Sequence, residues 1–224
     1  MKKLGMLSAA SNKIHTIESA YPDISFVQLF LDDNEITEIP HTVRNGKRMF
    51  FRIEDVETFS CTYNKLSKFP DIFDAESIYG MSSVDFSYNQ ITEFENQDAD
   101  YQGIYVATLS LANNPGLKKF PKCIAESKSK VDYINVRGCG IEEIPEGSFK
   151  GENTKYLVSL DLSYNKLKDF PREFTAASFP YFYGIDLSYN QFASFPYEPF
   201  DCASLTMFAL RGQRNAKGER CLTE

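Results

Sequence analysis

The fold is decided by the stretch Leu160-Asp161-Leu162-Ser163-Tyr164-Asn165-Lys166-Leu167, which is followed by Phe170-Pro171. The same frame returns as Ile185-Asp186-Leu187-Ser188-Tyr189-Asn190-Gln191-Phe192, and an earlier copy runs Val84-Asp85-Phe86-Ser87-Tyr88-Asn89-Gln90-Ile91. Each copy alternates apolar and polar residues before an Asn, and this alternation predicts a short strand with one buried side. Recurrence of the whole frame predicts a repeat architecture.

Less regular copies of this frame cover almost the whole chain. They share an apolar-x-apolar triplet with Asn, Cys or Gln three positions further on, and the triplets begin at Leu7, Leu29, Phe59, Leu109, Ile134 and Phe208. The Asn-type positions are 12, 34, 64, 89, 114, 139, 165, 190 and 213, so the period stays close to 25 residues. The largest gap, between positions 34 and 64, predicts an insertion near residues 44–55 that holds a longer loop or a short helix.

Composition narrows the class of protein. The 224 residues include 42% hydrophobic residues, enough to bury a core, with 19 Phe, 13 Tyr and no Trp. A net charge of −7 argues against nucleic-acid binding, which needs a basic face for the phosphates. No apolar run is long enough for a membrane-spanning helix. The five cysteines are widely spaced and odd in number, so buried apolar thiols are expected rather than a disulfide framework or a zinc site.

The N-terminus has two lysines and a short apolar stretch, which faintly resembles a secretory signal. The stretch is too short for a normal signal core, and residues from Leu7 onward belong to the first repeat, so no signal peptide is predicted.

The pattern resembles the leucine-rich repeat family, whose signature is LxxLxLxxNxL, over essentially the whole chain. The family accepts Cys in place of Asn, so Cys139 fits, and Phe replaces Leu at many positions here. The resemblance implies an α/β solenoid: a curved, right-handed horseshoe with a parallel β-sheet on the concave face and irregular, 3-10 or short helical segments on the convex face. The narrower resemblance is to bacterial cell-surface proteins of this family, which implies an extracellular or cell-surface location.

Two structural roles follow from the repeat. The Asn side chains at the turns are expected to bond backbone groups and form a buried ladder of Asn12, Asn34, Asn64, Asn89, Asn114, Cys139, Asn165 and Asn190. Apolar residues after the Pro are expected to close the core from the convex side, namely Phe73, Ile124, Phe149, Phe174 and Phe200.

The whole chain, 1–224, is therefore interpreted as one domain of about nine repeats. End repeats of a solenoid need caps. None is evident before Leu7, and the frame is lost after Gln213, so a fragment of a longer protein is expected, with a weak cap at 214–224 as the alternative.

The binding surface of this family is the outward side of the strands, which can be read as three columns. The first column is Ser8, Phe30, Ser60, Asp85, Ser110, Asn135, Asp161, Asp186 and Ala209. The second is Ala10, Asp32, Thr62, Ser87, Ala112, Arg137, Ser163, Ser188 and Arg211. The third is Ser11, Asp33, Tyr63, Tyr88, Asn113, Gly138, Tyr164, Tyr189 and Gly212.

Candidate interaction residues on these columns are Asp32, Tyr63, Asp85, Tyr88, Asn113, Arg137, Asp161, Tyr164, Asp186, Tyr189 and Arg211. The Tyr column either contacts a partner or only stacks to stabilise neighbouring strands. The aspartates either bind a basic or hydroxyl-rich group or are simply solvated. Arg137 and Arg211 either pair with Asp161 and Asp186 or meet an acidic group on a partner.

Asp161 and Asp186 are also spaced like the carboxylates of a retaining glycosidase, but an open surface has no cleft to raise a pKa, so catalysis is not expected. Calcium is poorly supported because it needs six or more oxygen ligands. The leading hypothesis is a non-enzymatic module without cofactor or metal that binds a protein, peptide or glycan through the concave face. The alternatives are a spacer or assembly segment of a larger surface protein, and the targeting part of an effector enzyme whose catalytic domain lies elsewhere.

Overall fold

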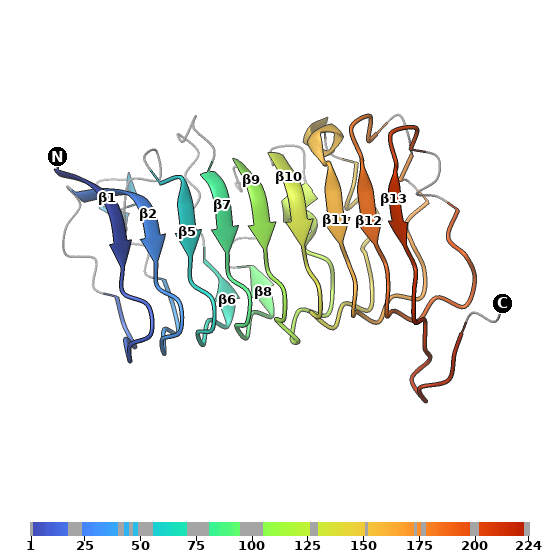
Figure 1. The fold of residues 1–224 in the computed structure, drawn as a ribbon, viewed down its shortest axis with the longest axis horizontal. Helices are drawn as coiled ribbons and strands as arrows, with labels where there is room; N and C mark the ends of the chain where they lie inside the picture. The colour runs from blue at the N-terminus through green and yellow to red at the C-terminus, as the bar shows by residue number, and fades with distance from the viewer. Residues whose placement is uncertain are drawn as a thin grey trace.

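In the part of the chain that the structure describes, nine parallel strands, one from each repeat, form a sheet along the molecule (Figure 1). They lie in chain order: β1 (Lys2–Ser8), β2 (Ile24–Phe30), β5 (Thr58–Ser60), β7 (Met81–Asp85), β9 (Tyr105–Ser110), β10 (Lys130–Asn135), β11 (Ser159–Asp161), β12 (Gly184–Asp186) and β13 (Met207–Ala209). The structure is a computed structural model that describes residues 2–17, 24–39, 43–44, 47–48, 56–70, 81–94, 105–125, 130–150, 152–172, 174–175, 178–197 and 202–221. The predicted parallel-sheet solenoid is confirmed.

Equivalent residues of the repeats pair in rows across the sheet. Ser60 pairs with Asp85 and Asp85 with Ser110, and this row continues without a slip to Asn135, Asp161, Asp186 and Ala209. Side chains alternate along a strand, so the flanking residues point to the other side of the sheet. There they form the core with the buried side chains of Phe59, Val84, Leu109, Ile134, Leu160 and Ile185.

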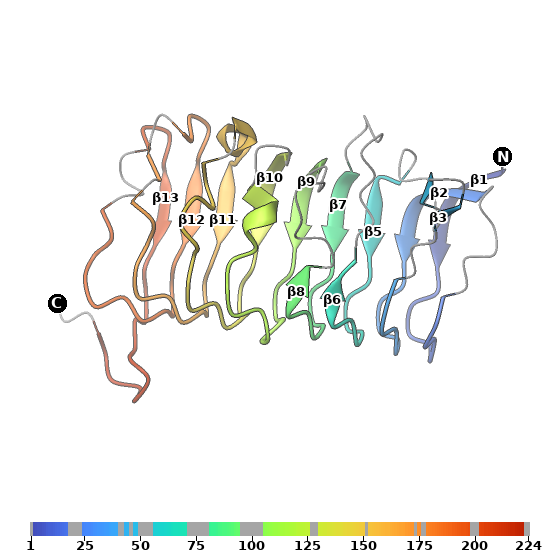
Figure 2. The ribbon, with the colours of Figure 1, turned by 180° about the vertical axis from the view of Figure 1, so that it is seen from behind.

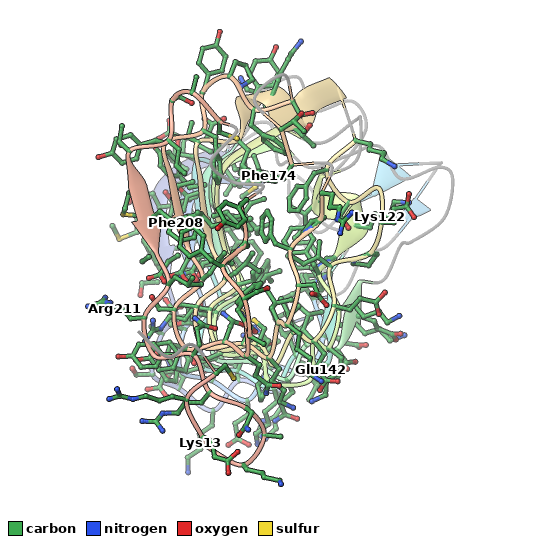
Figure 3. The ribbon with its side chains drawn as sticks, turned by 90° about the vertical axis from the view of Figure 1, so that its right-hand side faces the viewer. Lys13, Lys122, Glu142, Phe174, Phe208 and Arg211 are labelled. Carbon is green, nitrogen blue, oxygen red and sulfur yellow. The ribbon has the colours of Figure 1, made fainter. Side chains whose placement is uncertain are left out.

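The described parts of the connecting segments lie behind the sheet (Figure 2). Within the described residues they contain two short 3-10 helices, η2 (Lys122–Ala125) and η3 (Glu152–Tyr156), and a small parallel pair, β6 (Lys68–Phe69) with β8 (Glu93–Phe94). The predicted plugs Ile124, Phe149 and Phe174 are buried, whereas Phe73 and Phe200 lie outside the described residues. Figure 3 shows Phe174 well inside the molecule.

Aromatic packing dominates this rear layer toward the C-terminal repeats. Phe149 meets Phe174 edge to face at 5.3 Å between ring centroids, and Phe174 stacks on Phe179 at 3.9 Å. Phe182 completes the group, at 4.8 Å from Phe174. Much of the Phe excess in the composition therefore fills the core in place of Leu.

The predicted insertion near residues 44–55 falls mostly outside the described residues. The described part is an antiparallel pair, β3 (Val43–Arg44) with β4 (Lys47–Arg48), in which Val43 pairs with Arg48.

Each asparagine of the repeat joins its own turn to the repeat before it. The Asn165 Oδ1 accepts from the backbone amides of Cys139 at 3.1 Å and Ile141 at 2.9 Å, while its Nδ2 donates to the Val136 carbonyl at 2.9 Å. The same Nδ2 also donates to Leu162 and Ser163 in its own repeat. An Oδ1 bond to an amide of the preceding repeat is also made by Asn34, Asn64, Asn89, Asn114 and Asn190.

Cys139 occupies the ladder position but cannot offer an oxygen. Its thiol donates to the Leu111 carbonyl at 3.0 Å, as the Asn amide does elsewhere. The amide of Leu117, which would otherwise face an Asn oxygen, donates instead to the Asn114 carbonyl at 3.1 Å. Leu117 lies three residues after Asn114, one more than the equivalent apolar residue in other repeats, and the extra residue forms the turn that brings these two backbone groups together.

The two ends of the ladder differ. Asn12 is exposed and its Nδ2 donates to the Ala9 and Ala10 carbonyls of its own turn. Gln213 is buried, and its Oε1 accepts from the Phe192 amide at 3.1 Å while its Nε2 donates to the Leu187 carbonyl at 2.8 Å. A glutamine therefore takes the ninth position, which the sequence-based list of ladder residues left out.

After Gln213 the chain turns back on itself. Arg214 forms an antiparallel bridge with Arg220, and the Cys221 amide donates to the Gln213 carbonyl at 3.1 Å. The Asn215 Oδ1 holds the turn by accepting from the amides of Lys217 and Glu219. Residues 214–221 therefore form a small hairpin against the last turn of the solenoid.

Candidate functional site

The open face is the side of the sheet away from the core. The first predicted column lies on it and the third borders it, whereas the second is partly buried, at Ser87, Ala112, Ser163 and Ser188. The third column does not continue the strands. All nine of its residues have φ between 52° and 67°, the left-handed region, in a turn that ends each strand: Ser11, Asp33, Tyr63, Tyr88, Asn113, Gly138, Tyr164, Tyr189 and Gly212. A bulky Tyr is disfavoured in this conformation, so its presence at four of these turns reflects its side chain rather than its backbone.

The four tyrosines form two stacked pairs along the border of the open face. Tyr63 and Tyr88 lie 4.2 Å apart between ring centroids with planes 8° apart, and Tyr164 and Tyr189 lie 4.2 Å apart with planes 25° apart. Their side chains remain between 42% and 56% exposed. A hydrogen bond with the Tyr88 hydroxyl is the main cause that raises the pKa of Tyr63. The stacked rings can stabilise neighbouring strands, and their exposed edges and hydroxyls can also contact a partner, so the structure is compatible with both roles expected for this column.

Arg137 extends the second tyrosine pair. Its guanidinium lies 3.9 Å above the centroid of the Tyr164 ring, and its Nη1 donates to the Ser163 hydroxyl at 2.9 Å. Arg211 is exposed, and in Figure 3 its side chain extends away from the sheet. Within the described residues, no ion pair joins either arginine to Asp161 or Asp186.

The aspartates of the first column have a structural role that the sequence analysis did not foresee. The Oδ1 atoms of Asp85, Asp161 and Asp186 each accept a hydrogen bond of 2.8 or 2.9 Å from the backbone amide two residues on. Asn135 makes the same bond to the Arg137 amide at 3.1 Å. This local bond, typical of Asx turns, ends the strand at each of these repeats.

Asp32 differs because it belongs to the second column. Its Oδ1 accepts from the Thr62 amide at 2.8 Å and from the hydroxyls of Thr62 and Ser60 at 2.7 and 2.5 Å. It thereby bridges β2 to β5.

The candidate interaction residues thus fall into two groups along the border of the open face. Tyr63 and Tyr88 form one, and Arg137, Tyr164 and Tyr189 form the other. Between them stand Asn113 and Gly138, where the Asn113 Oδ1 lies 2.7 Å from the place a Cβ of residue 138 would occupy. Asp161 and Asp186 are direct partners on neighbouring strands beside the second group.

The open face also contains a row that the sequence analysis missed, two residues before the first column. It pairs in register from Met6 through Gln28, Thr58, Ser83, Thr108, Tyr133, Ser159 and Gly184 to Met207. Tyr133 and Met207 are its large exposed side chains near the second group. The sequence could have revealed this row, because strand alternation places Tyr133, two positions before Asn135, on the same side of the sheet as Asn135.

Charged pairs lie after the turns, where the chain leaves the open face. Lys65 pairs with Glu35 at 2.6 Å and Lys166 with Glu142 at 3.1 Å, each joining neighbouring repeats. The hydrogen bond from each lysine lowers the pKa of its glutamate. Figure 3 places Glu142 on the far side of the molecule from Arg211. These lysines are therefore charged residues away from the open face.

Two other features are absent from the described residues. No group of three or more His, Cys, Asp or Glu side chains in this part of the chain could hold a metal ion. No helix in the same residues has the length and apolar character to cross a membrane.

Comparison with known proteins supports the repeat assignment. Residues 156–176 match the family model described as Leucine Rich Repeat. A leucine-rich repeat protein from Bacteroides eggerthii is 38% identical, with a TM-score of 0.84 over 99% of this chain and 37% of its own. One from Bacteroides thetaiotaomicron is 36% identical, with a TM-score of 0.87 over 97% of this chain and 26% of its own.

Keratocan from Gallus gallus is 29% identical over 143 residues, which is 63% of this chain and 36% of keratocan. The chain therefore spans between 26% and 37% of the length of these relatives. The repeat, the fold and these similarities support a leucine-rich repeat protein. It resembles bacterial members of that class, whose fold is typical of non-catalytic binding or scaffold modules.

Proposed function

We propose that this chain is a non-enzymatic recognition module whose open face binds a protein, peptide or glycan. The observation that carries the proposal is the pair of aromatic groups, Tyr63 with Tyr88 and Arg137 with Tyr164 and Tyr189. They stand half-exposed on a rigid sheet in which every strand is in register. Tyrosine and arginine are enriched where proteins bind partners, because both give large contact area and hydrogen bonds together.

The tyrosines occupy a backbone position that suits Gly, Asn, Asp or Ser better, as the other repeats illustrate. The unfavourable backbone conformation of Tyr at four turns has to be offset by interactions of the side chain. Stacking of the rings offsets part of this cost, and contact with a ligand would offset the rest.

An enzymatic role is disfavoured by the same geometry. Asp161 and Asp186 are carboxylates on neighbouring strands of the open face, and each uses an oxygen to hold a backbone amide of its own turn. A general acid needs a raised pKa, which requires an enclosed or apolar setting that a sheet surface does not offer.

The proposal extends to location and partners by resemblance alone. The sequence resemblance to bacterial cell-surface proteins of this family supports a surface or secreted location, and the acidic net charge favours a partner other than nucleic acid. A role as a scaffold segment is the second candidate, since the relatives continue well beyond the length of this chain.

The test is a ligand screen with matched variants. The wild-type chain is probed against a displayed library of random peptides and against a glycan array. Each ligand found is then measured with the double variant Tyr88→Asn and Tyr164→Asn. Asparagine is the replacement because Asn113 already occupies the same turn conformation, so the fold should persist.

Lys65→Gln with Lys166→Gln is the control, since these lysines lie beyond the turns. The proposal expects binding to be lost in the tyrosine variant and kept in the lysine variant, with both unchanged in circular dichroism. A scaffold role would give no ligand for the open face, and equal loss in both variants would refute binding at this face.

A further inference from the structure

The second aromatic group, Arg137 with Tyr164 and Tyr189, lies within a pattern of charges that the neighbouring repeats do not share. Arg137-Gly138 in the repeat of β10 and Arg211-Gly212 in the repeat of β13 enclose two repeats with the sequence Asp-Leu-Ser-Tyr-Asn. In the second column the order along the sheet is Arg137, Ser163, Ser188 and Arg211. In the first column the two inner strands contribute Asp161 and Asp186. Positive groups therefore stand at both ends and negative groups between them.

Arg137 is already held in a fixed orientation. The Tyr164 ring covers one face of the guanidinium at 3.9 Å, and Ser163 accepts from Nη1 at 2.9 Å. A planar guanidinium with free N–H groups matches a carboxylate, and fixing it beforehand removes an entropy cost from binding. Gly138, the next residue along the chain, adds no side chain beside it.

The spacing of the charges selects the ligand. Arg137 and Arg211 are three strands apart, which is about 14 Å at the usual strand separation. In an extended peptide, residues i and i+4 are about 13–14 Å apart, and residues i, i+2 and i+4 face the same way. The residue at i+2 then lies midway, where Asp161 and Asp186 stand on the two inner strands.

We infer that this part of the open face takes an extended peptide running across β10 to β13, with acidic residues at i and i+4 and a basic residue at i+2. The inference rests on the proposed function and names its ligand class. Arg137 and Arg211 bind the two carboxylates, and Asp161 and Asp186 receive the cation between them. A uniformly anionic glycan fits less well because its middle charges would face the two aspartates.

Three short peptides test the pattern by fluorescence anisotropy at low ionic strength. The first is Ser-Glu-Ser-Lys-Ser-Glu-Ser. The second has the charges reversed, Ser-Lys-Ser-Glu-Ser-Lys-Ser, and the third has the composition of the first with another spacing, Ser-Glu-Glu-Ser-Ser-Lys-Ser. We expect the wild-type chain to bind the first about five-fold or more tightly than either comparator, since each exposed ion pair contributes a factor of a few. The preference should shrink as salt is added.

Variants of the chain then assign the contacts. Arg137→Gln and Arg211→Gln should each weaken binding of the first peptide about five-fold. Asp161→Asn with Asp186→Asn should weaken it similarly without disturbing the turns, because Asn135 holds the same amide with an asparagine oxygen. Asp85→Asn, in the same column but three strands from Asp161, and Lys166→Gln, on the far edge, are controls that should leave binding unchanged.

Equal binding of the three peptides, or unchanged binding by Arg137→Gln, overturns the inference. If the ligands found in the screen are glycans or peptides without this charge order, and they depend on Tyr164, the inference is wrong while the proposed function stands. If no ligand depends on the open face at all, both fall together.

Discussion

The ring of Tyr189 lies 2.6 Å from the point where a Cβ on Gly212 would stand, and Gly212 itself has a φ of +64°. Two separate constraints therefore act on this glycine, the left-handed backbone and the covering ring. Gly218 shares the first constraint, with a φ of +81°, but nothing lies within 4 Å of its Cβ position.

Gly212→Ala should therefore destabilise the chain more than Gly218→Ala. The backbone strain alone costs about 1 kcal/mol, and displacing a packed ring adds about 1–3 kcal/mol. Urea denaturation followed by circular dichroism measures both variants. Equal losses would mean that the Tyr189 ring moves aside without cost.

Removing a ladder asparagine should be costly. In Asn165→Ala the amides of Cys139 and Ile141 lose their acceptor inside the protein, so we expect a loss of about 3 kcal/mol or more in the free energy of unfolding. Asn12→Ala is the control, because Asn12 is exposed, and should cost well under half as much. Similar losses in thermal or urea unfolding would contradict a special role for the buried ladder.

The aspartates that end the strands should tolerate asparagine but not alanine. Asp161→Ala removes the acceptor of the Ser163 amide and is expected to cost about 1 kcal/mol. Asp161→Asn should be nearly neutral, because Asn135 performs the same task one strand away. Urea midpoints of the two variants decide the matter, and an equal loss in both would show that the charge, not the hydrogen bond, stabilises the turn.

Tyr63 should titrate later than an ordinary tyrosine. The hydrogen bond with Tyr88 raises the pKa of Tyr63, so the folded state holds this proton more tightly than the unfolded state does. The resulting contribution to stability is complete below the usual tyrosine pKa of about 10 and is lost as the pH rises through the raised value. Carbon-13 NMR of labelled tyrosine measures the pKa. Tyr88→Phe should lower it and Tyr189→Phe should not.

The buried thiols of the ladder region should be unreactive in the folded protein. Burial is the main cause that raises the pKa of Cys139 to about 12, and it raises the pKa of Cys61 as well. Cys221 is partly exposed in the terminal hairpin. Brief labelling with a maleimide at pH 8, followed by peptide mass spectrometry, should therefore modify Cys221 and spare the other two. Fast labelling of Cys139 would show that the ladder opens readily.

The sequence predicted the strand rows well because its period is regular. One conserved spacing between apolar triplets placed Ser60, Asp85 and Ser110 in a single row, and the structure pairs them that way. Core residues such as Phe149 and Phe174 followed from their place after the Pro. These predictions needed only the alternation of apolar and polar residues and the repeat period, both of which can be read from the amino-acid sequence.

What the sequence did not reveal depends on local hydrogen bonds. An alternating pattern places Tyr164 after Ser163 but does not say that the backbone turns left-handed there. Likewise, Asp161 looked like a free surface charge, although the Asp-x-Ser spacing is that of a side chain that holds the amide two residues on. The period placed Gln213 at the ninth position, but it was left out of the predicted ladder residues because its side chain is longer than that of Asn; in the structure it makes the equivalent bonds.

The ladder gives the molecule a direction. The oxygen that accepts from the turn after Asn34 belongs to Asn64, and the oxygen for the turn after Asn165 belongs to Asn190, so these turns depend on the repeat that follows them. The turn after Asn114 is the exception, because Leu117 donates to the Asn114 carbonyl instead. During synthesis, the amide of a newly made turn has no acceptor within the protein until the next repeat, about 25 residues later, has been made. A repeat can therefore be removed or duplicated only if each turn amide still meets the side-chain oxygen of a following repeat. This makes the whole repeat the unit by which such a chain can lengthen or shorten.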